Sequence, residues 1–317
     1  MYHKNAMYKV FVVGYGEMFA NVILGAKDFG CDVFGVLLDE QIKNNSFCLN
    51  IKRIFLPSKD YLFIKNLNIN EFKYKSINSV GLKKELLKYQ PDFIFVASWS
   101  EKLKKEIIDL PKIATINVHP SLLPKYRGAN PYYRAILNQE KKTGITFHLV
   151  NEKWDSGEIL LQKEVDILDT DNGKTLKNKC CNIARQATYD LLKSLSEEII
   201  IPIKQKEQEA TYYPAISAKD VLIDFEKSWD KIDAQLRGLY PWASGFFKIK
   251  NFYFKITSYK IKDFVHNQKA GSVIQKGFKT LTLALNNDKV IEFRNLKGIT
   301  FLETFFLPLY IKIFVRK

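Results

Sequence analysis

The chain has 317 residues, a formal net charge of +15, 46% hydrophobic residues and 26% charged residues. This length exceeds that of one ordinary domain and predicts two, and the composition is that of a globular protein. The most apolar segment, Phe305 to Val315, is shorter than the roughly 20 residues of a membrane span. It is also interrupted by Pro308 and Lys312 and is expected to pack as a tail, so composition excludes a membrane-spanning protein.

The N-terminus and the cysteines predict the cellular compartment. Residues 1–9 are basic and polar and lack the apolar region and cleavage site of a signal peptide, so we expect a cytoplasmic protein. The cysteines have no metal-site spacing, so we expect reduced core thiols and no metal. They are Cys31, Cys48, Cys180 and Cys181. The excess of lysine is compatible with a polyanionic partner or with a compositional bias.

The first elements predict an α/β fold. Apolar runs over Val10 to Val13 and Val33 to Leu38 flank the turn Gly14-Tyr15-Gly16 and a helical segment that ends at Phe29. Strand, glycine turn, helix and strand in this order predict a Rossmann-like, doubly wound sheet. Phe19 stands where a dinucleotide fingerprint has its third glycine, so NAD binding is not expected.

Two further strands predict the place of a ligand site. Asp92 to Ala97 has the pattern of a buried strand, Glu101 to Ile108 that of a short helix, and Ile113 to Val118 that of a strand ending at His119. Ligands of open α/β sheets collect at the carboxyl ends of the strands. Asn117 and His119 are both expected there.

The following segments complete the first domain. We expect a helix after Pro131, strands over Gly144 to Val150 and Glu158 to Val165 with a turn at Trp154 to Gly157 between them, and a helix from about Lys174 to Leu195.

A polar run over residues 204–210 is the predicted linker, so we expect a first domain over 1–203 and a second over 211–317. Beyond the linker, Ile232 to Leu239 has a helical pattern and five short strand-like runs follow. These runs are Gly245 to Lys250, Tyr253 to Tyr259, Gly271 to Gln275, Thr280 to Leu285 and Val290 to Phe293. Their close spacing predicts a small, OB-like β-barrel.

The run from Asn117 to Gly128, with the sequence NVHPSLLPKYRG, carries most of the chemistry. Strand residues two apart point to the same face, so Asn117 and His119 can converge on one reacting group. Pro120 and Pro124 bracket a stiff loop that can hold a ligand at little ordering cost. The alternative is a strand-to-turn connection with a satisfied histidine.

Asp155 supplies a carboxylate 36 residues after His119, in a Trp-Asp-Ser-Gly turn. The intervening helix and strand can return it to the same sheet edge, although a lone aspartate before Ser-Gly is usually turn chemistry. His148 is interpreted as structural. Arg127 either pairs with an acidic group of a ligand or forms a salt bridge within its own turn.

Together these residues resemble the signature of the 10-formyltetrahydrofolate-dependent formyltransferases. The residues that carry the likeness are Asn117, His119, Ser121 to Pro124, Arg127-Gly128, and Asp155 with Gly157. It extends over about residues 8 to 295, because three later segments are similar to the C-terminal domain of the methionyl-tRNA enzymes of that family. These are Ala210-Thr211-Tyr212, Ile223-Asp224-Phe225 and Pro241-Trp242.

The resemblance implies an enzyme that moves a formyl group from 10-formyltetrahydrofolate to a primary amine. Asn117 would donate an amide N–H to the oxyanion. His119 would donate to that oxyanion or accept the amine proton, and Asp155 would orient its imidazole. The resemblance also implies that the folate contacts Ser121, Leu122, Leu123 and Pro124, and that no metal takes part.

The acceptor stays open between initiator methionyl-tRNA, which we prefer, and an amino-sugar nucleotide. The charge and the predicted barrel favour tRNA. Against it, Gly14 to Met18 differs from the Gly-Thr-Pro opening of the tRNA enzymes, and Gln41 to Ile54 lacks their long Gly- and Lys-rich loop. Tyr132-Tyr133 could instead stack on a nucleotide. A third hypothesis is a nucleic-acid-binding module with a relict active site, which predicts RNA binding without folate turnover.

Overall fold

The computed structural model describes residues 7–39, 49, 53, 56–249, 252–278, 280–294 and 297–298. The chain divides into two compact units, and each takes more than one stretch of chain. The first unit comprises Met1–Gly128, Thr143–Asp166 and Lys177–Tyr212, and the second Ala129–Lys142, Ile167–Leu176 and Tyr213–Lys317. The predicted domain limits, 1–203 and 211–317 with a linker between them, stay a prediction.

The first unit contains a seven-stranded sheet in the order β3-β2-β1-β4-β5-β7-β8. Its strands are β1 (Lys9–Gly14), β2 (Asp32–Leu38), β3 (Asn70–Glu71), β4 (Phe93–Ala97), β5 (Ala114–His119), β7 (Lys142–Leu149) and β8 (Ile159–Asp166). The pairs from β3 to β5 are parallel, whereas β7 lies antiparallel to β5. The predicted α/β sheet is confirmed in this mixed form, and its central strands are buried on both faces as parallel strands usually are.

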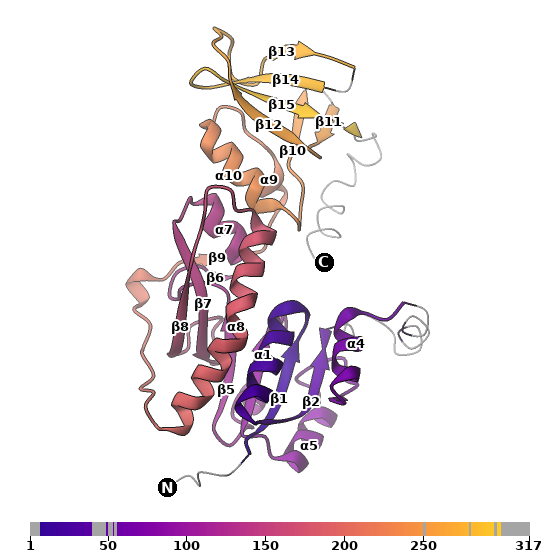
Figure 1. Ribbon diagram of the computed structural model, residues 1–317, viewed down its shortest axis with the longest axis vertical. Helices are drawn as coiled ribbons and strands as arrows, with labels where there is room; N and C mark the ends of the chain where they lie inside the picture. Colours follow the sequence, from indigo (N-terminus) through magenta and orange to yellow (C-terminus); the bar gives the residue numbers. More distant parts are fainter. Residues whose placement is uncertain are drawn as a thin grey trace. The chain divides into compact units, whose positions relative to one another are not determined.

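Helices cover both faces of this sheet (Figure 1). They are α1 (Gly16–Phe29), α4 (Lys59–Asn66), α5 (Val80–Tyr89), α6 (Lys105–Ile108) and α8 (Gly173–Ser196). On one face α1 packs on α8, with an Asp28–Arg185 ion pair at 2.5 Å and the rings of Phe29 and Tyr189 5.7 Å apart. On the other face, Phe11 of β1 shares a core cluster with Leu82 of α5 and Ile107 of α6.

Three of these elements differ from the sequence prediction. The predicted helix Glu101 to Ile108 begins only at Lys105, because the Glu101 carboxylate accepts hydrogen bonds from Ser76, Ile77 and Asn78. Helices α4 and α5 were not predicted. Each begins at a serine whose hydroxyl oxygen caps the helix, Ser58 accepting from Tyr61 N–H and Ser79 from Leu82 N–H, both at 3.1 Å.

The turn between β1 and α1 is built for close packing and carries no third glycine. A Cβ at Gly14 would lie 1.9 Å from the carbonyl oxygen of Ala97, so only glycine lets β1 end this close to β4. Phe19 is fully buried, and the Asp60 carboxylate accepts the Gly16 N–H at 2.9 Å. A carboxylate of the chain therefore occupies the helix N-terminus at which dinucleotide-binding folds hold a pyrophosphate.

The second unit combines helices with two antiparallel sheets. The helices are α7 (Pro131–Leu137), α9 (Ala218–Val221) and α10 (Trp229–Leu239). One sheet has the order β10-β11-β16 and the other β12-β15-β14-β13. The strands are β10 (Phe246–Ile249), β11 (Phe252–Lys255), β12 (Tyr259–Asp263), β13 (Val273–Lys276), β14 (Thr280–Leu285), β15 (Lys289–Arg294) and β16 (Lys297–Gly298).

The two sheets share one core, in which the ring of Phe247 on β10 stacks on that of Phe293 on β15 at 4.8 Å. The predicted strand Tyr253 to Tyr259 is divided between β11 and β12. No strand pairing within the described ranges joins the two sheets into a closed barrel, so the OB-like barrel stays a prediction.

The remaining short elements are β6 (Arg127–Gly128), the 3₁₀ helix η1 (Glu207–Glu209) and β9 (Tyr212–Tyr213). Cys31, Cys180 and Cys181 are buried, as expected for core thiols. The predictions for Cys48, for Phe305 to Val315 and for most of Gln41 to Ile54 concern positions outside the described residues. Among the helices that the structure describes, none has the length and apolar character to cross a bilayer.

Candidate active site

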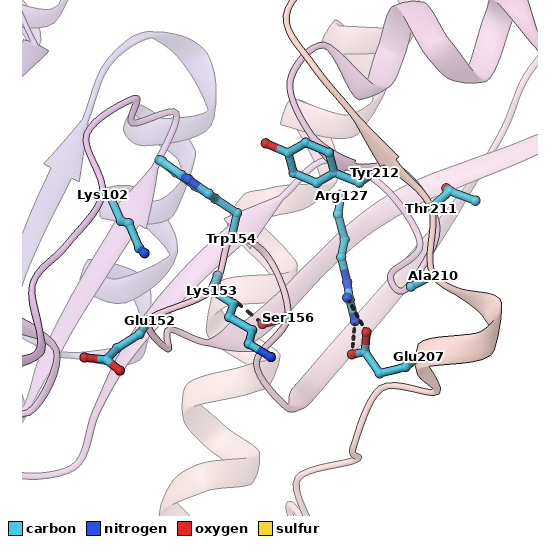
Figure 2. Close-up of a pocket in the computed structure, with 10 residues that line it drawn as sticks. All are labelled: Lys102, Arg127, Glu152, Lys153, Trp154, Ser156, Glu207, Ala210, Thr211 and Tyr212. Atoms are coloured by element: carbon cyan, nitrogen blue, oxygen red, sulfur yellow. Dashed lines mark hydrogen bonds and ion pairs between the residues drawn. The ribbon is translucent and has the colours of Figure 1, made fainter.

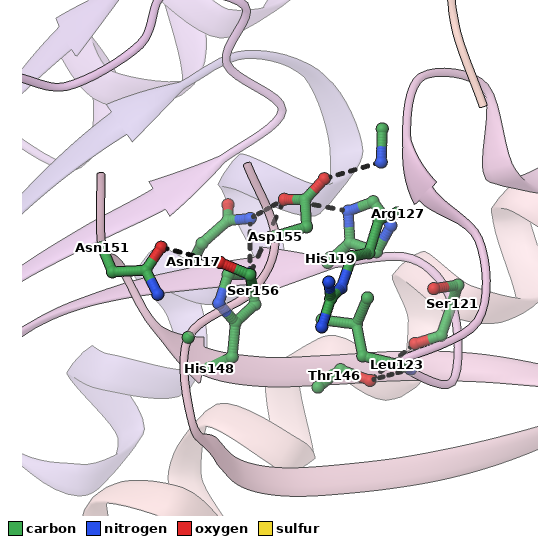
Figure 3. Close-up of polar contacts among 12 residues, drawn as sticks. Asn117, His119, Ser121, Leu123, Arg127, Thr146, His148, Asn151, Asp155 and Ser156 are labelled. Atoms are coloured by element: carbon green, nitrogen blue, oxygen red, sulfur yellow. Dashed lines mark hydrogen bonds and ion pairs between the residues drawn. The ribbon is translucent and has the colours of Figure 1, made fainter. Parts of the chain in front are cut away.

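The carboxyl end of β5 brings Asn117 and His119 to one edge of the sheet (Figure 3). The neighbouring strand β7 runs in the opposite direction, and its register pairs Asn117 with His148 and His119 with Thr146. Directly opposed residues of an antiparallel pair have their side chains on the same face. The site therefore receives side chains from two strands.

Asp155 reaches these side chains from the turn between β7 and β8. Its backbone has a φ of 51°, the left-handed region that costs a residue with a Cβ free energy. A Cβ at Gly157 would lie 1.7 Å from the carbonyl oxygen of Leu149, so glycine is needed for the turn to pack against the end of β7. The turn is thus held close to β7, with the Asp155 side chain directed at the end of β5.

Polar atoms of three side chains and one backbone N–H meet at Asp155. Its Oδ1 lies 3.2 Å from Asn117 Nδ2, 3.5 Å from His119 Nδ1 and 3.7 Å from His148 Nε2. Its Oδ2 accepts the backbone N–H of Gly128 at 2.8 Å. His119, His148 and Asp155 are 5%, 2% and 8% exposed, so the cluster is nearly closed to solvent and its electrostatic interactions are weakly screened.

Backbone carbonyls indicate where the hydrogens of the two histidines lie. His119 Nε2 is 2.8 Å from the Tyr126 carbonyl oxygen and must donate to it, which leaves Nδ1 facing Asp155. His148 Nδ1 donates to the Leu149 carbonyl at 2.9 Å, so its Nε2 can accept from Asn117 Nδ2 at 3.0 Å. Asn117 therefore directs one amide hydrogen to His148 and the other to Asp155.

Burial and hydrogen bonding set the ionisation of the cluster. Burial lowers the pKa of His119 and outweighs the opposing effects of the Asp155 carboxylate and the Tyr126 carbonyl. Burial by itself would raise the pKa of Asp155, but His119, His148 and the Gly128 N–H together lower it to about 2. The site at neutral pH is therefore a carboxylate beside a neutral imidazole, which can take up a proton on Nδ1 and then pair with Asp155.

Hydrogen bonds from side chains of β7 and β8 fix the backbone of the loop of residues 121–124. Thr146 Oγ1 donates to the Ser121 carbonyl at 2.6 Å and accepts the Leu123 N–H at 3.2 Å. Gln162 Nε2 donates to the Leu123 carbonyl at 2.8 Å. Ser121 and Leu123 are buried, whereas Leu122 and Pro124 are partly exposed and can contact a ligand directly.

A hollow of about 510 Å³ opens in the first unit beside the Asp155 turn (Figure 2). Trp154 and Ser156, the neighbours of Asp155 in the chain, both line it. Asn117, His119 and Asp155 themselves do not. The other lining residues are Lys102, Arg127, Glu152, Lys153, Glu207, Ala210, Thr211 and Tyr212. A ligand in the hollow would thus lie on the outer side of the turn.

The structure brings Asn117, His119 and Asp155 together and places two further side chains beside them, His148, which the sequence suggested to be structural, and Gln205. The structural interpretation of His148 is incomplete, because its Nε2 contacts Asn117 and lies near Asp155. The alternation of Thr146 and His148 on one strand face was the available signal. Gln205, assigned to the linker, is 5% exposed and donates to the Asp155 carbonyl at 2.9 Å.

Tyr132, Tyr133 and Arg127, which the sequence suggested as possible ligand contacts, are engaged by other residues of the chain. Tyr132 and Tyr133 are buried within the second unit, the former stacked on Trp242 at 5.9 Å, so neither ring is open to a nucleotide. Arg127 pairs with Glu207 at 2.8 Å, and this partner stands 80 positions later in the chain, outside the turn of Arg127.

Comparison with known families gives the chain its identity. The formyl transferase model matches residues 8–192, and the model of the formyl transferase C-terminal domain matches residues 215–299. The chain belongs to the formyl transferase family. Its activity is therefore formyl transfer, and the matched N-terminal region contains all four residues of the cluster.

Relatives extend this likeness along the chain. The methionyl-tRNA formyltransferase of Caldanaerobacter subterraneus subsp. tengcongensis is 36% identical over 225 residues, which are 71% of this chain and 72% of that protein. The methionyl-tRNA formyltransferase of Bacillus licheniformis is 29% identical over 86% of this chain and 88% of its own. The solved structure of WlaRD, a sugar 3N-formyl transferase, shares the fold with a TM-score of 0.65 at 18% identity, covering 92% of this chain and 98% of that one.

Proposed function

We propose that this formyl transferase takes its formyl group from 10-formyltetrahydrofolate and gives it to the amino group of initiator methionyl-tRNA. The observation that carries the proposal is the likeness to methionyl-tRNA formyltransferases, at 36% identity over 71% of the chain. The Bacillus licheniformis relative extends the likeness to 86% of the chain. A folate donor is supported by WlaRD, whose structure was determined in the presence of 5-N-formyl-THF.

In this proposal, Asn117, His119 and Asp155 act on the attack of the amine. The amine nitrogen bonds to the formyl carbon, and the carbonyl oxygen takes the electron pair. His119 Nδ1 takes the proton that the amine loses, and Asp155, 3.5 Å away, stabilises the imidazolium. Collapse of the oxyanion then breaks the bond to N10 of the folate, and His119 returns the same proton to N10 as it leaves.

Asn117 would donate to the oxyanion. Its amide hydrogens point to the His148 ring nitrogen at 3.0 Å and to the Asp155 carboxylate at 3.2 Å. The bond to the ring nitrogen is the weaker of the two, because the other has an ionised carboxylate as its acceptor. Turning the weaker-bound hydrogen to the oxyanion replaces the ring nitrogen by a negatively charged acceptor. Such preorganised donors typically lower the barrier by about 3–4 kcal/mol.

The loop of Ser121, Leu122, Leu123 and Pro124 is proposed to contact the folate. The proposal is supported by the hydrogen bonds of Thr146 and Gln162 to the loop, which fix its backbone without a ligand. Of the four residues, Leu122 and Pro124 are partly exposed and offer apolar contact to a folate ring.

Basic residues of the second unit support a nucleic acid acceptor. Register places Lys248 opposite Tyr253 and Lys255 opposite Phe246, so both lysines share one face of the β10–β11 pair. The Lys248 ammonium lies 5.5 Å from the Tyr253 ring centroid. With a formal charge of +15 over the whole chain, such a face can neutralise phosphates.

An amino-sugar nucleotide is the second candidate acceptor. It is favoured by the likeness to WlaRD, a sugar 3N-formyl transferase whose structure was determined in the presence of dTDP and which this chain matches over 98% of its length. The burial of Tyr132 and Tyr133 argues against this acceptor, because neither ring is accessible for stacking on a nucleotide.

One experiment separates these acceptors. Purified full-length protein is given radiolabelled 10-formyltetrahydrofolate with either aminoacylated initiator tRNA or a panel of dTDP-amino sugars, and labelled product is counted. Transfer to tRNA whose rate falls steeply with added salt is the expected result. Transfer to the sugars alone would replace the acceptor, and RNA binding without any transfer would favour the relict-site hypothesis.

A further inference from the structure

Gln205 stands in a polar run that the sequence assigned to a linker, yet it is almost fully enclosed in the first unit at 5% exposure. Its Nε2 donates to two backbone carbonyls of one turn, Asp155 at 2.9 Å and Gly157 at 2.7 Å. Both hydrogens of the side-chain amide are thereby used on the turn that carries the proposed catalytic carboxylate. A flexible linker has no need of such contacts.

Arg127 fixes the other end of this amide. Its Nε and one terminal nitrogen donate to Gln205 Oε1 at 3.0 and 2.8 Å, and the guanidinium also pairs with Glu207. A flipped Gln205 amide would set its NH₂ against the guanidinium and its oxygen against two carbonyls, so only one orientation is chemically possible. Arg127 itself belongs to β6, next to Gly128, whose N–H binds Asp155 Oδ2.

Hydrogen bonds therefore fix both the side chain and the backbone of Asp155. The Gly128 N–H holds its side chain, and Gln205 holds its backbone carbonyl. This backbone has a φ of 51°, a conformation that relaxes unless surrounding bonds maintain it. Without Gln205, two buried carbonyls would also lose their donors, which costs free energy and favours a shifted turn.

We propose that Gln205, locked by Arg127, is a positioning residue that sets the distance between the Asp155 carboxylate and His119. This inference rests on the role proposed above for Asp155. A displacement of about 1 Å in a catalytic group can reduce the rate about 100-fold, and the turn has no other side-chain donor among the described contacts of its Asp155 and Gly157 carbonyls.

Substitution of Gln205 in the full-length protein tests the inference. Gln205→Met removes both ends of the bridge at similar volume, and Gln205→Glu keeps an acceptor for Arg127 while removing the two donors. Both variants are expected to lower kcat about 100-fold with little change in KM for either substrate. The acid limb of the kcat profile should move to lower pH, because Asp155 and His148 are the titratable groups acting on His119 and a displaced Asp155 raises its pKa less.

The matched control is Gln235→Met. Gln235 is 3% exposed, and its Nε2 donates to the Asp220 and Leu222 carbonyls at 2.8 and 3.1 Å in the second unit. Thermal unfolding of both methionine variants gives the structural cost of losing such a bridge, and only the Gln205 variant should lose kcat.

The outcomes distinguish failure of the positioning role of Gln205 from failure of the proposed catalytic role of Asp155. Wild-type kcat and an unmoved acid limb in Gln205→Glu, with Asp155→Asn inactive, would overturn the positioning role alone. Full activity of Asp155→Asn would overturn the proposed function of the site as well. Equal loss of kcat in Gln205→Met and Gln235→Met would reduce the effect to general destabilisation and also overturn the inference.

Discussion

Replacement of Asp155 by asparagine is the sharpest test of the proposed mechanism. The change keeps an oxygen for the Gly128 N–H and nearly the same volume, but it removes the negative charge beside His119 Nδ1. Two unit charges 3.5 Å apart attract by about 5 kcal/mol at an effective dielectric constant near 20. Because His119 and Asp155 are 5% and 8% exposed, solvent screens little of this interaction.

The expected loss follows from that interaction. About 5 kcal/mol corresponds to nearly four powers of ten in rate if the imidazolium forms in the transition state. Part of it is recovered by relaxation, so we expect kcat to fall about 10²–10⁴-fold. KM should change little, because the carboxylate acts on His119 and not on a substrate. Steady-state kinetics with either substrate saturating measures the two separately.

The direction of the pH dependence follows from the sign of the charge. The Asp155 carboxylate raises the pKa of His119 against the lowering by burial, so its removal lowers that pKa further. A base that must be neutral then stays active to lower pH, and the acid limb of kcat moves down. A limb that moves up, or a rise in KM with unchanged kcat, would refute the mechanism.

Asp220→Asn provides the control for loss of a partly buried, ion-paired carboxylate. Asp220 pairs with Arg134 at 2.5 Å in the second unit, and its side chain is 16% exposed. Removing it should reduce stability, since it leaves Arg134 without its charge partner, but the acid limb should stay in place. An equal shift of the limb in this variant would mean that the effect does not come from the charge next to His119.

Further substitutions test the other side chains. His119→Ala and Asn117→Ala should each lower kcat about 10²–10³-fold while circular dichroism stays native, and near wild-type transfer by both would dismiss the site. His148→Leu should lower stability by about 1–3 kcal/mol and reduce kcat, since it leaves an Asn117 hydrogen without its acceptor; unchanged kcat would make His148 purely structural. Lys248→Glu with Lys255→Glu should weaken tRNA binding and flatten its salt dependence without affecting folate binding; an unchanged salt slope would exclude this face as the tRNA contact.

The sequence by itself determined the α/β class of the first unit and the edge at which its chemistry lies. Local patterns sufficed for this, because a fully buried strand such as β4 is a continuous apolar run and a glycine turn before a helix is written in adjacent residues. Asn117 and His119 could be paired from spacing alone, since side chains two apart on a strand share a face. Helices α4 and α5 were missed although Ser58 and Ser79 mark their starts.

The tertiary structure decided which distant residues complete the site. His148 reaches Asn117 only because β7 runs antiparallel to β5 in one particular register, and a shift of one residue would turn His148 to the other face. Gln205 holds Asp155 from 50 positions away in the chain, through contacts that leave no periodic trace in the sequence. A local pattern records which face a residue presents, whereas its partner across the fold depends on strand direction, register and loop packing, which are properties of the whole chain.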